Sequence, residues 1–364
     1  MIILGIEGSA NKIGVGITKN NEILSNPRVT FITPPGSGFV PTEVMLHHQK
    51  NILSLIKQAL KEANLNLRDI DAIAYTKGPG MAGPLSVGAL VARILSLKLE
   101  ILIIPVNHCI AHIEMGKMVT GAENPVVLYA SGGNTQIVTF QKAKNDQKAK
   151  NDQKLKNDEK KFKLKGKYKI VGEALDIAVG NCLDRVARLL NISNDPSPGY
   201  NIEQYAKRGT KYYSLPITIK GMDISCGGVV CYIKDNFINK KNVKKTGKKY
   251  EEELTEELKE NICYSLQEKL FSSLVEVTER ALCLFDSKEV LLVGGVGCNE
   301  RLQEMMEIMT KERGATVCKM DERYCVDNGA MIAYTASLDP KKYEIADCTI
   351  TQRFRTDAVD IFYK

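Results

Sequence analysis

Two successive series of strand-like and helix-like segments constrain the fold of this chain more than any other feature. Each series opens with apolar strands and continues as strand–helix alternation, which is typical of helices packed on a sheet. The first series covers residues 2–6, 14–18, 47–63, 72–75, 85–97 and 102–105, with a helical segment from Asn107. The second covers residues 126–130, 173–190, 254–284, 290–293, 300–311 and 328–336. We therefore expect two α/β domains facing a cleft.

The length of the chain supports two cores, because 364 residues exceed what one hydrophobic core usually holds. The predicted units are residues 1–124 and 125–335, followed by a C-terminal tail at 336–364. Two charged segments interrupt the second unit. Residues 141–167 contain an imperfect lysine-rich repeat without a hydrophobic face, which predicts a largely disordered insertion in a hairpin loop. Residues 239–250 predict a charged loop.

The formal net charge of +7 is concentrated in that repeat. Residues 142–169 hold twelve lysines against four acidic residues, a local charge of +8, which leaves about −1 for the rest of the chain. Binding of a polyanion would therefore use a local patch or a partner, and not a general positive field. The repeat itself can be interpreted as a basic segment for RNA or as a repeat expansion without function, and the sequence leaves both open.

The ten cysteines are dispersed and form no C-x-x-C pair. This argues against a zinc ribbon and a secreted disulfide scaffold, and it favours buried free thiols in a reducing compartment. The sequence has no long uninterrupted apolar run, so we predict no membrane-spanning helix. The apolar start at residues 2–6 lacks a basic leader and meets an acid at Glu7, so we interpret it as a first strand and not as a targeting peptide.

His108 and His112 form the most specific local signal. Asn107 can cap a helix that places both imidazoles on one face, one turn apart, which is a common metal-binding arrangement. The alternative is a pair of half-buried histidines packed in the core. Cys109 follows the first histidine where a zinc protease would need a glutamate, so protease activity is disfavoured.

Glycine-rich turns occur at residues 78–83, 129–135 and 293–301. Gly132 and Gly133 leave backbone N–H groups free to approach a phosphate or carboxylate, although a Gly-Gly-Asn sequence is also a hairpin signal. The strand, turn and helix at 293–301 suit a nucleotide lying close to a helix N-terminus.

Two aspartates are ambiguous from their local sequence. Asp327 precedes the last clear helix, where an N-cap is the simpler interpretation. Asp184 lies off the apolar stripe of its expected helix and would face either a ligand or water.

Together these motifs resemble the universal tRNA threonylcarbamoyladenosine synthase family, historically called O-sialoglycoprotein endopeptidases. The resemblance is closest to the archaeal and eukaryotic cytosolic branch, the catalytic subunit of the KEOPS complex. It covers nearly the whole chain apart from the lysine repeat and the region around Lys240. The segments that carry it are residues 5–12, 78–83, 107–116, 129–135, 173–185, 194–203, 294–301 and 321–331. Glu7-Gly8-Ser9-Ala10 stands where the organellar branch has Glu-Thr-Ser-Cys, which favours the cytosolic branch and a cytoplasmic and nuclear location.

The resemblance implies the actin/Hsp70/sugar-kinase fold, with two related α/β domains around a nucleotide and metal cleft. It implies one divalent metal ion, iron or zinc, held by His108, His112, Tyr129 and Asp327, which makes Asp327 a ligand and not a cap. The implied substrate contacts are Tyr129, Ala130, Ser131, Gly132, Gly133, Asp184, Gly199, Glu203 and Asn299. No general base is assigned.

The implied reaction moves a threonylcarbamoyl group from threonylcarbamoyl-AMP to the adenosine 3′ of the anticodon, in tRNAs reading codons that begin with adenine. The implied partners are tRNA and KEOPS subunits, including a small atypical kinase, and no membrane. One segment departs from the family pattern, because Cys226-Gly227-Gly228 follows Ser225 where the family often has Phe-Ser-Gly. A non-catalytic nucleotide-binding scaffold of the same complex is the alternative, and a small-molecule kinase of the same fold, which would need ATP, comes third.

Overall fold

The computed structural model describes residues 1–143, 163–239, 254–339 and 341–363. Its first sheet has the strand order β3-β2-β1-β5-β6, with β4 paired to β2. β1 pairs antiparallel with β2 and parallel with β5, and β5 pairs parallel with β6. The strands are β1 (Ile2–Glu7), β2 (Lys12–Lys19), β3 (Glu22–Ser25), β4 (Arg28–Thr30), β5 (Ala72–Gly78) and β6 (Leu102–Asn107).

The second sheet has the order β13-β12-β7-β8-β9-β14. β12 runs parallel to β7 and β13, whereas β7, β8 and β9 are antiparallel neighbours. Its strands are β7 (Val126–Ala130), β8 (Thr135–Lys142), β9 (Gly166–Glu173), β12 (Glu289–Val293), β13 (Thr316–Lys319) and β14 (Asp360–Ile361); β10 (Ile219–Lys220) and β11 (Asp223–Ile224) form a separate pair.

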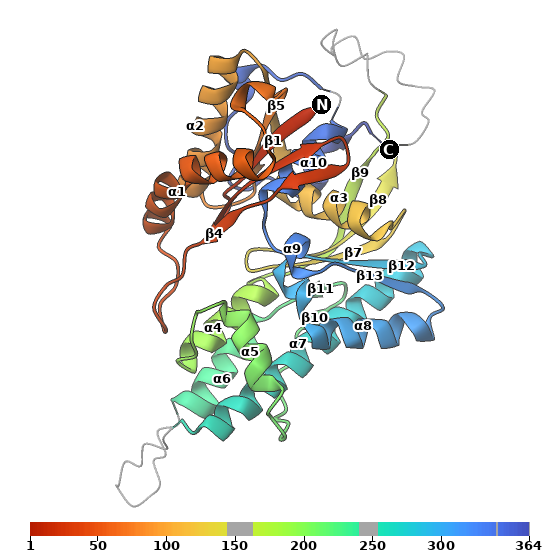
Figure 1. Cartoon of the computed structure of the whole chain (residues 1–364). Helices are drawn as coiled ribbons and strands as arrows, with labels where there is room; N and C mark the ends of the chain where they lie inside the picture. Colours follow the sequence, from red (N-terminus) through yellow and green to blue (C-terminus); the bar gives the residue numbers. More distant parts are fainter. Residues whose placement is uncertain (144–162, 240–253, 340, 364) are drawn as a thin grey trace, which may run out of the picture.

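Helices separate and cover the two sheets (Figure 1). The helices of the first half are α1 (Pro41–Glu62), α2 (Ala82–Leu99) and α3 (His108–Thr120). Those of the second half are α4 (Val179–Leu189), α5 (Pro198–Ala206), α6 (Gly227–Ile233), α7 (Glu256–Phe285), α8 (Glu300–Glu312), α9 (Glu322–Cys325) and α10 (Gly329–Leu338). Single turns lie at η1 (Leu67–Asp69), η3 (Lys234–Ile238), η4 (Gly295–Cys298), η5 (Ile345–Asp347) and η6 (Thr356–Ala358).

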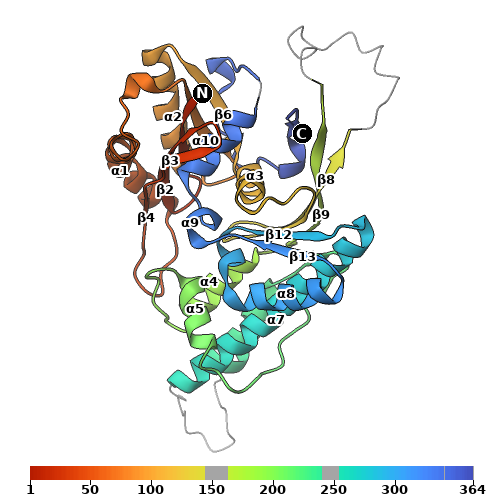
Figure 2. The same cartoon turned by 45° about the vertical axis from the view of Figure 1, so that its right-hand side comes forward.

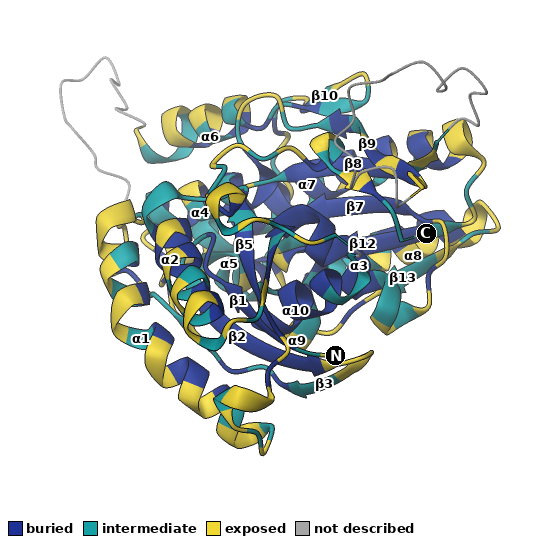
Figure 3. Ribbon diagram, turned by 90° about the horizontal axis from the view of Figure 1, so that it is seen from above, coloured by how far each residue is buried: buried dark blue, intermediate teal, exposed yellow. Residues whose placement is uncertain are grey.

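Three hydrophobic cores alternate with the two sheets. One joins α1 and α2 to the first sheet, the second fills the space between the sheets around α3 and α10, and the third lies under α4 to α8. β1 shows why its sequence is a continuous apolar run: Ile3 packs in the middle core, whereas Leu4 and Ile6 pack in the outer one. A strand buried on both faces needs no polar alternation. The faces of α1 and α2 that turn away from the sheet are exposed (Figure 3).

The α10 helix differs from the predicted domain boundaries. The boundaries 125–335 place it in the second unit, but it packs against β1 and β2 of the first sheet. A Cβ on Gly5 would lie 2.4 Å from Ala333 N, and one on Gly16 would lie 2.1 Å from Ala330 N. The helix therefore lies on a strip of the sheet that lacks side chains, a close approach that glycine alone permits.

The segment predicted as a tail, 336–364, completes both units. Residues 349–358, here called the strap, run along the first sheet and reach the second, where β14 pairs with β9. Figure 2 shows the C-terminal end of the chain close to β8 and β9. The strap therefore connects the two sheets through hydrogen bonds to β5 and β8.

The helix predicted at 173–190 is shorter. Residues up to Glu173 belong to β9, and the helix begins only at Val179. Asp176 holds the intervening turn, because its carboxylate accepts hydrogen bonds from the backbone N–H groups of Ile177, Cys226 and Gly227. Leu175, which completed the expected apolar stripe, is 59% exposed outside the helix.

The charged insertion is framed by a hairpin. β8 and β9 pair as far as Lys142 and Gly166, so the edges of the predicted insertion 141–167 are strand. Residues 144–162 of the insertion, and most of the loop predicted at 239–250, lie outside the described residues.

By length and composition, α2 is the one described helix apolar enough to cross a membrane, although no such helix was expected. The core helix of an α/β unit passes the same test, and α2 packs on β5 and α1.

Candidate metal and nucleotide site

The α3 helix presents the two histidines as its sequence predicts. Asn107 is the N-cap, and its side-chain oxygen accepts hydrogen bonds from Cys109 N and Ile110 N. His108 and His112 follow at a spacing of one turn, with their ring centroids 4.7 Å apart. Both are buried, and His108 lines a large cleft.

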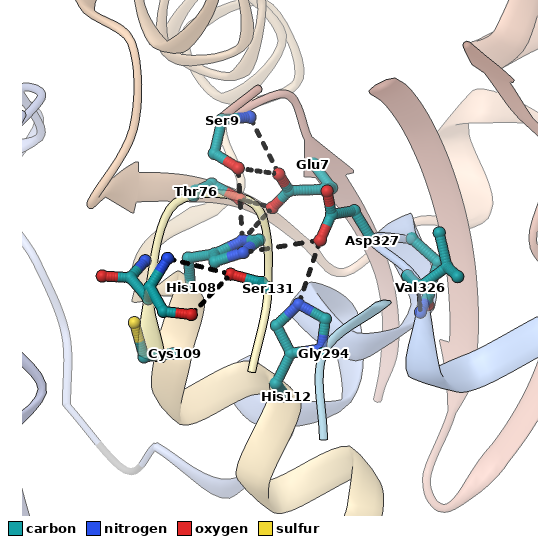
Figure 4. A network of polar contacts seen from close by, with 12 residues as sticks. Glu7, Ser9, Thr76, His108, Cys109, His112, Ser131, Gly294, Val326 and Asp327 are labelled. Atoms are coloured by element: carbon teal, nitrogen blue, oxygen red, sulfur yellow. Dashed lines mark hydrogen bonds and ion pairs between the residues drawn. The ribbon is translucent and has the colours of Figure 1, made fainter. Parts of the chain in front are cut away.

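Asp327 reaches the same point from the other end of the chain. Its Oδ1 atom lies 3.1 Å from His112 Nε2 and 3.5 Å from His108 Nε2 (Figure 4). One ligand atom from each of the three residues lies within 4.8 Å of the others. Asn328, and not Asp327, caps α10 by accepting a hydrogen bond from Met331 N. The local sequence therefore suggested a cap one residue too early.

Glu7 orients His108 from the opposite side. The fully buried carboxylate of Glu7 accepts hydrogen bonds from Ser9 N, the Ser9 hydroxyl and the Thr76 hydroxyl. Its Oε2 lies 3.0 Å from His108 Nδ1, so the other ring nitrogen, Nε2, is left facing Asp327. A carboxylate behind a histidine in this way fixes the ring orientation and tautomer of metal ligands.

Burial and charge oppose each other in this cluster. Burial would lower the pKa of His108, but the charge and hydrogen bond of Glu7 outweigh it and raise the pKa to about 9. Burial would raise the pKa of Asp327, but the contact with His112 and the charge of Lys12 hold it well below its ordinary value. Burial lowers the pKa of His112 and keeps that imidazole neutral. The fully buried Glu7 and the half-buried Asp327 thus lie on either side of His108 and favour positive charge there.

Tyr129 completes the predicted metal set. It is fully buried at the end of β7, with its ring centroid 5.3 Å from that of His112. Burial raises the pKa of its hydroxyl well above the ordinary value, so the phenol is protonated at neutral pH unless a cation draws the proton away. Its hydroxyl accepts a hydrogen bond of 3.4 Å from Ser131 Oγ.

The cleft that opens from this cluster has a volume of about 1710 Å³. Ser131, Gly132 and Gly133 line it, and a Cβ on either glycine would meet nothing within 4 Å, so the loop backbone is open to a ligand. Ala130 does not line the cleft, because it is fully buried behind the loop, with its carbonyl oxygen 2.5 Å from where a Cβ of Gly294 would lie.

The remaining predicted contacts lie on the second unit. Gly199 and Asp184 line the cleft from α5 and α4. Burial raises the pKa of Asp184 to about 6, although Arg188 and Lys12 oppose the shift.

Glu203 and Asn299 meet at the start of α8. Glu203 Oε1 accepts a hydrogen bond of 3.0 Å from Glu300 N, and burial raises its pKa. The Asn299 side chain caps α8 and donates to Gln267 Oε1. Both residues line the cleft, but one oxygen of each side chain already accepts hydrogen bonds from the N-terminus of α8.

Sequence reasoning assigned no role in the site to Glu7, Ser9, Thr76 or the strap. An acid directly after an apolar strand was the available signal for Glu7, because a charge at a buried strand end needs partners. The strap carried no comparable signal, since its place depends on contacts with both units.

Both the sequence and the fold of this chain are similar to those of known proteins. The sequence model of the family described as tRNA N6-adenosine threonylcarbamoyltransferase matches residues 22–160 and 156–334. A probable tRNA N6-adenosine threonylcarbamoyltransferase of Drosophila melanogaster is 51% identical over 99% of this chain and 98% of its own length. The tRNA N6-adenosine threonylcarbamoyltransferase of Encephalitozoon cuniculi is 50% identical over 100% of this chain and 99% of its own length.

A solved structure of similar fold is component A of the (R)-2-hydroxyglutaryl-CoA dehydratase of Acidaminococcus fermentans. It is 14% identical, with a TM-score of 0.51 over 93% of this chain and 99% of that one. This likeness concerns the fold alone, and it confirms the expected two-domain actin/Hsp70/sugar-kinase-like architecture. On its sequence, and over almost its full length, the chain belongs to the tRNA N6-adenosine threonylcarbamoyltransferase family.

Proposed function

We propose that this chain transfers the threonylcarbamoyl group of threonylcarbamoyl-AMP to N6 of the adenosine 3′ of the anticodon, in tRNAs reading codons that begin with adenine, and that the transfer depends on a bound metal ion. The family and its full-length relatives support the transferase activity on tRNA. The observation that carries the metal dependence is the cluster of the buried His108 and His112 with the half-buried Asp327, which opens onto the cleft.

The donor set suits a transition-metal ion. Two imidazole nitrogens, a carboxylate oxygen and the phenol oxygen of Tyr129 form a mixed N/O set that iron and zinc both accept. A bound ion of this kind would supply Lewis-acid polarisation of the donor's oxygens. His108, His112, Asp327 and Tyr129 would hold it, and Glu7 would keep His108 in the correct orientation.

The transfer forms a bond between N6 and the carbamoyl carbon and breaks the bond from that carbon to the phosphate oxygen. AMP leaves with the electron pair, and one proton leaves N6. The backbone N–H groups of Gly132 and Gly133, whose loop is open to the cleft, would donate hydrogen bonds to the phosphate and to the developing negative charge. Asp184 would accept hydrogen bonds from ribose hydroxyls. Glu203 would do so through Oε2, to which no described residue donates a hydrogen bond.

Transfer of labelled threonylcarbamoyl from its adenylate to tRNA, without ATP, tests this function. Wild-type protein should label the tRNA and should lose activity in chelator. His108→Ala should lower the transfer rate at least ~100-fold. Loss of a group that holds the metal or stabilises charge in the transition state lowers rates on this scale. His47→Ala, outside the cluster, is the matched control. Full activity of His108→Ala would exclude the metal role, and product formation that needs ATP would favour a kinase.

We further infer that the enzyme works within a KEOPS-type complex with a small atypical kinase, in the cytoplasm and nucleus. The charge of the chain outside the lysine repeat is close to neutral. This supports a tRNA-binding surface to which several subunits contribute. Co-purification of tagged full-length protein with an atypical kinase tests it, and isolation of an active single chain would contradict the need for partners.

A further inference from the structure

The strap carries a cationic side chain to which the site described above assigns no role. On the side before Arg353, Thr351 N donates to Lys77 O at 2.7 Å and Gly80 N donates to Gln352 O at 3.1 Å. On the side after it, Asn107 Nδ2 donates to Phe354 O at 3.1 Å. Arg353 thus lies between two backbone anchors, and one of them, Asn107, also caps the helix that begins with His108.

The far end of the strap is held by the second sheet. The buried hydroxyl of Thr356 donates to Gln136 Oε1 at 2.9 Å. Arg355 Nη2 lies 3.3 Å from Glu173 Oε1, and Arg355 also pairs with Asp357. Hydrogen bonds from both units therefore hold the backbone around Arg353, so the side chain extends from a fixed position.

The two strap arginines differ in their neighbours. Arg355 is neutralised by two carboxylates, whereas Arg353 has no hydrogen bond and no ion pair with any residue that the structure describes. Arg353 is exposed and lines the cleft together with Gln352 and Phe354. A guanidinium on a fixed backbone, at a cleft and without a carboxylate partner, is suited to a phosphate group, which it can bind through two parallel hydrogen bonds.

We propose that Arg353 binds a phosphate of the tRNA backbone beside the target adenosine, and that the strap is the wall of the cleft that receives the RNA. This rests on the proposed function. The loop suited to the adenylate phosphate, at Gly132 and Gly133, and the start of α5 at Gly199 belong to the second unit. The anchors on either side of Arg353, at Gly80 and Asn107, belong to the first unit. Because the adenylate would be held by the second unit, the wall formed by the strap is available to tRNA, the second substrate.

Two measurements on full-length protein test the proposal, with Arg353→Gln, Arg353→Lys and the exposed Arg68→Gln as variants. The first is transfer kinetics with tRNA varied at saturating adenylate, and then with adenylate varied at saturating tRNA. For Arg353→Gln we expect the KM for tRNA to rise about ten-fold, the loss expected for one charge-assisted hydrogen-bonded contact, with the KM for adenylate unchanged. Arg353→Lys should recover part of the loss, and Arg68→Gln should behave as wild type.

The second measurement is equilibrium binding of the anticodon stem-loop at several salt concentrations. Removal of one phosphate contact should reduce the slope of log K against log salt by about 0.7 to 1. A raised KM for adenylate with tRNA unaffected would assign Arg353 to the nucleotide phosphate and overturn the proposal. An unchanged slope and an unchanged KM for tRNA would overturn it as well. If wild-type protein transfers nothing, the proposed function fails, but the binding slope still decides the role of Arg353.

Discussion

Glu7 is a buried carboxylate whose lost hydration is compensated by hydrogen bonds and an ion pair from neighbouring side chains. Burial would raise its pKa, but the charge and hydrogen bond of His108 outweigh burial and lower it, so Glu7 remains ionised. The hydroxyls of Ser9 and Thr76 occupy further oxygen lone pairs. The same set of contacts leaves His108 with its Nε2 directed at Asp327.

Glu7→Gln should weaken metal binding while the chain remains folded. The amide can offer an N–H to His108 Nδ1 where the carboxylate accepted one, so the tautomer with Nε2 free is no longer enforced. We expect the affinity for zinc, measured by competition with a fluorescent chelator, to fall about 10- to 100-fold. The exposed Glu22→Gln is the control. Unchanged affinity in Glu7→Gln would show that Glu7 does not position the ligand.

Asp184 predicts a pH-dependent stability. Its carboxyl keeps its proton in the folded protein up to a pKa of about 6, whereas in the unfolded chain it loses it near pH 4. The native state binds more protons between these values, so raising the pH through this window destabilises it. Asp184→Asn removes the cost of ionising this carboxyl in the folded protein. The gain in Tm should therefore be near zero at pH 4 and reach a few degrees at pH 7.5. The corresponding gain in the free energy of unfolding has an upper limit of about 3 kcal/mol.

Thermal melts at the two pH values measure this difference directly. The exposed Asp235→Asn serves as the control for removing a surface carboxylate. An equal gain for Asp184→Asn at both pH values would show that the carboxyl is not destabilised by burial.

At the scale of elements, the contact of α10 with β1 and β2 joins the last helix to the first hairpin of the chain. Gly16→Ala would place a methyl group 2.1 Å from Ala330 N, which is backbone and cannot rotate away. The helix must shift, so we expect the free energy of unfolding to fall by about 1–3 kcal/mol or more. Gly228→Ala in α6 is the matched control, since a Cβ there meets nothing within 4 Å. Urea unfolding compares the two, and equal stabilities would contradict this packing.

The same contact places Asp327 in the site. Asp327 lies two residues before α10 begins, so a displaced α10 moves the carboxylate away from His112. We therefore expect Gly16→Ala to lower zinc affinity in proportion to the displacement, although no ligand is changed.

At the scale of the whole molecule, the described residues that form the three cores, the two sheets and the strap all lie outside residues 144–162. The hairpin that carries it is already paired at Ala143 and Lys165, whose backbone hydrogen bond is 2.9 Å long. Replacing residues 144–162 with a short Gly-Ser linker should leave Tm within about 2 °C, because loop closure entropy changes slowly with loop length. A large loss of Tm would contradict this. The salt slope of tRNA binding in the shortened protein separates an RNA-binding segment from a functionless expansion.

Some features follow from the sequence alone because they are local. The apolar runs of β1 and β7 predict strands, and the cap at Asn107 with histidines one turn apart predicts two imidazoles on one helix face. These hold because a strand or a helix fixes the relation of side chains a few residues apart. The role of Asp327 came from the family resemblance, since its local sequence favours a cap.

Only the tertiary structure decided the contacts between distant segments. The distance from His112 to Asp327, the pairing of Glu7 with His108, the position of α10 on the first sheet and the course of the strap all join residues on different elements. No local pattern encodes them, because they depend on how two sheets pack across a shared core. The sequence alone determined which groups this protein can offer to a metal and a nucleotide, and the packing of the two units decided which of those groups meet.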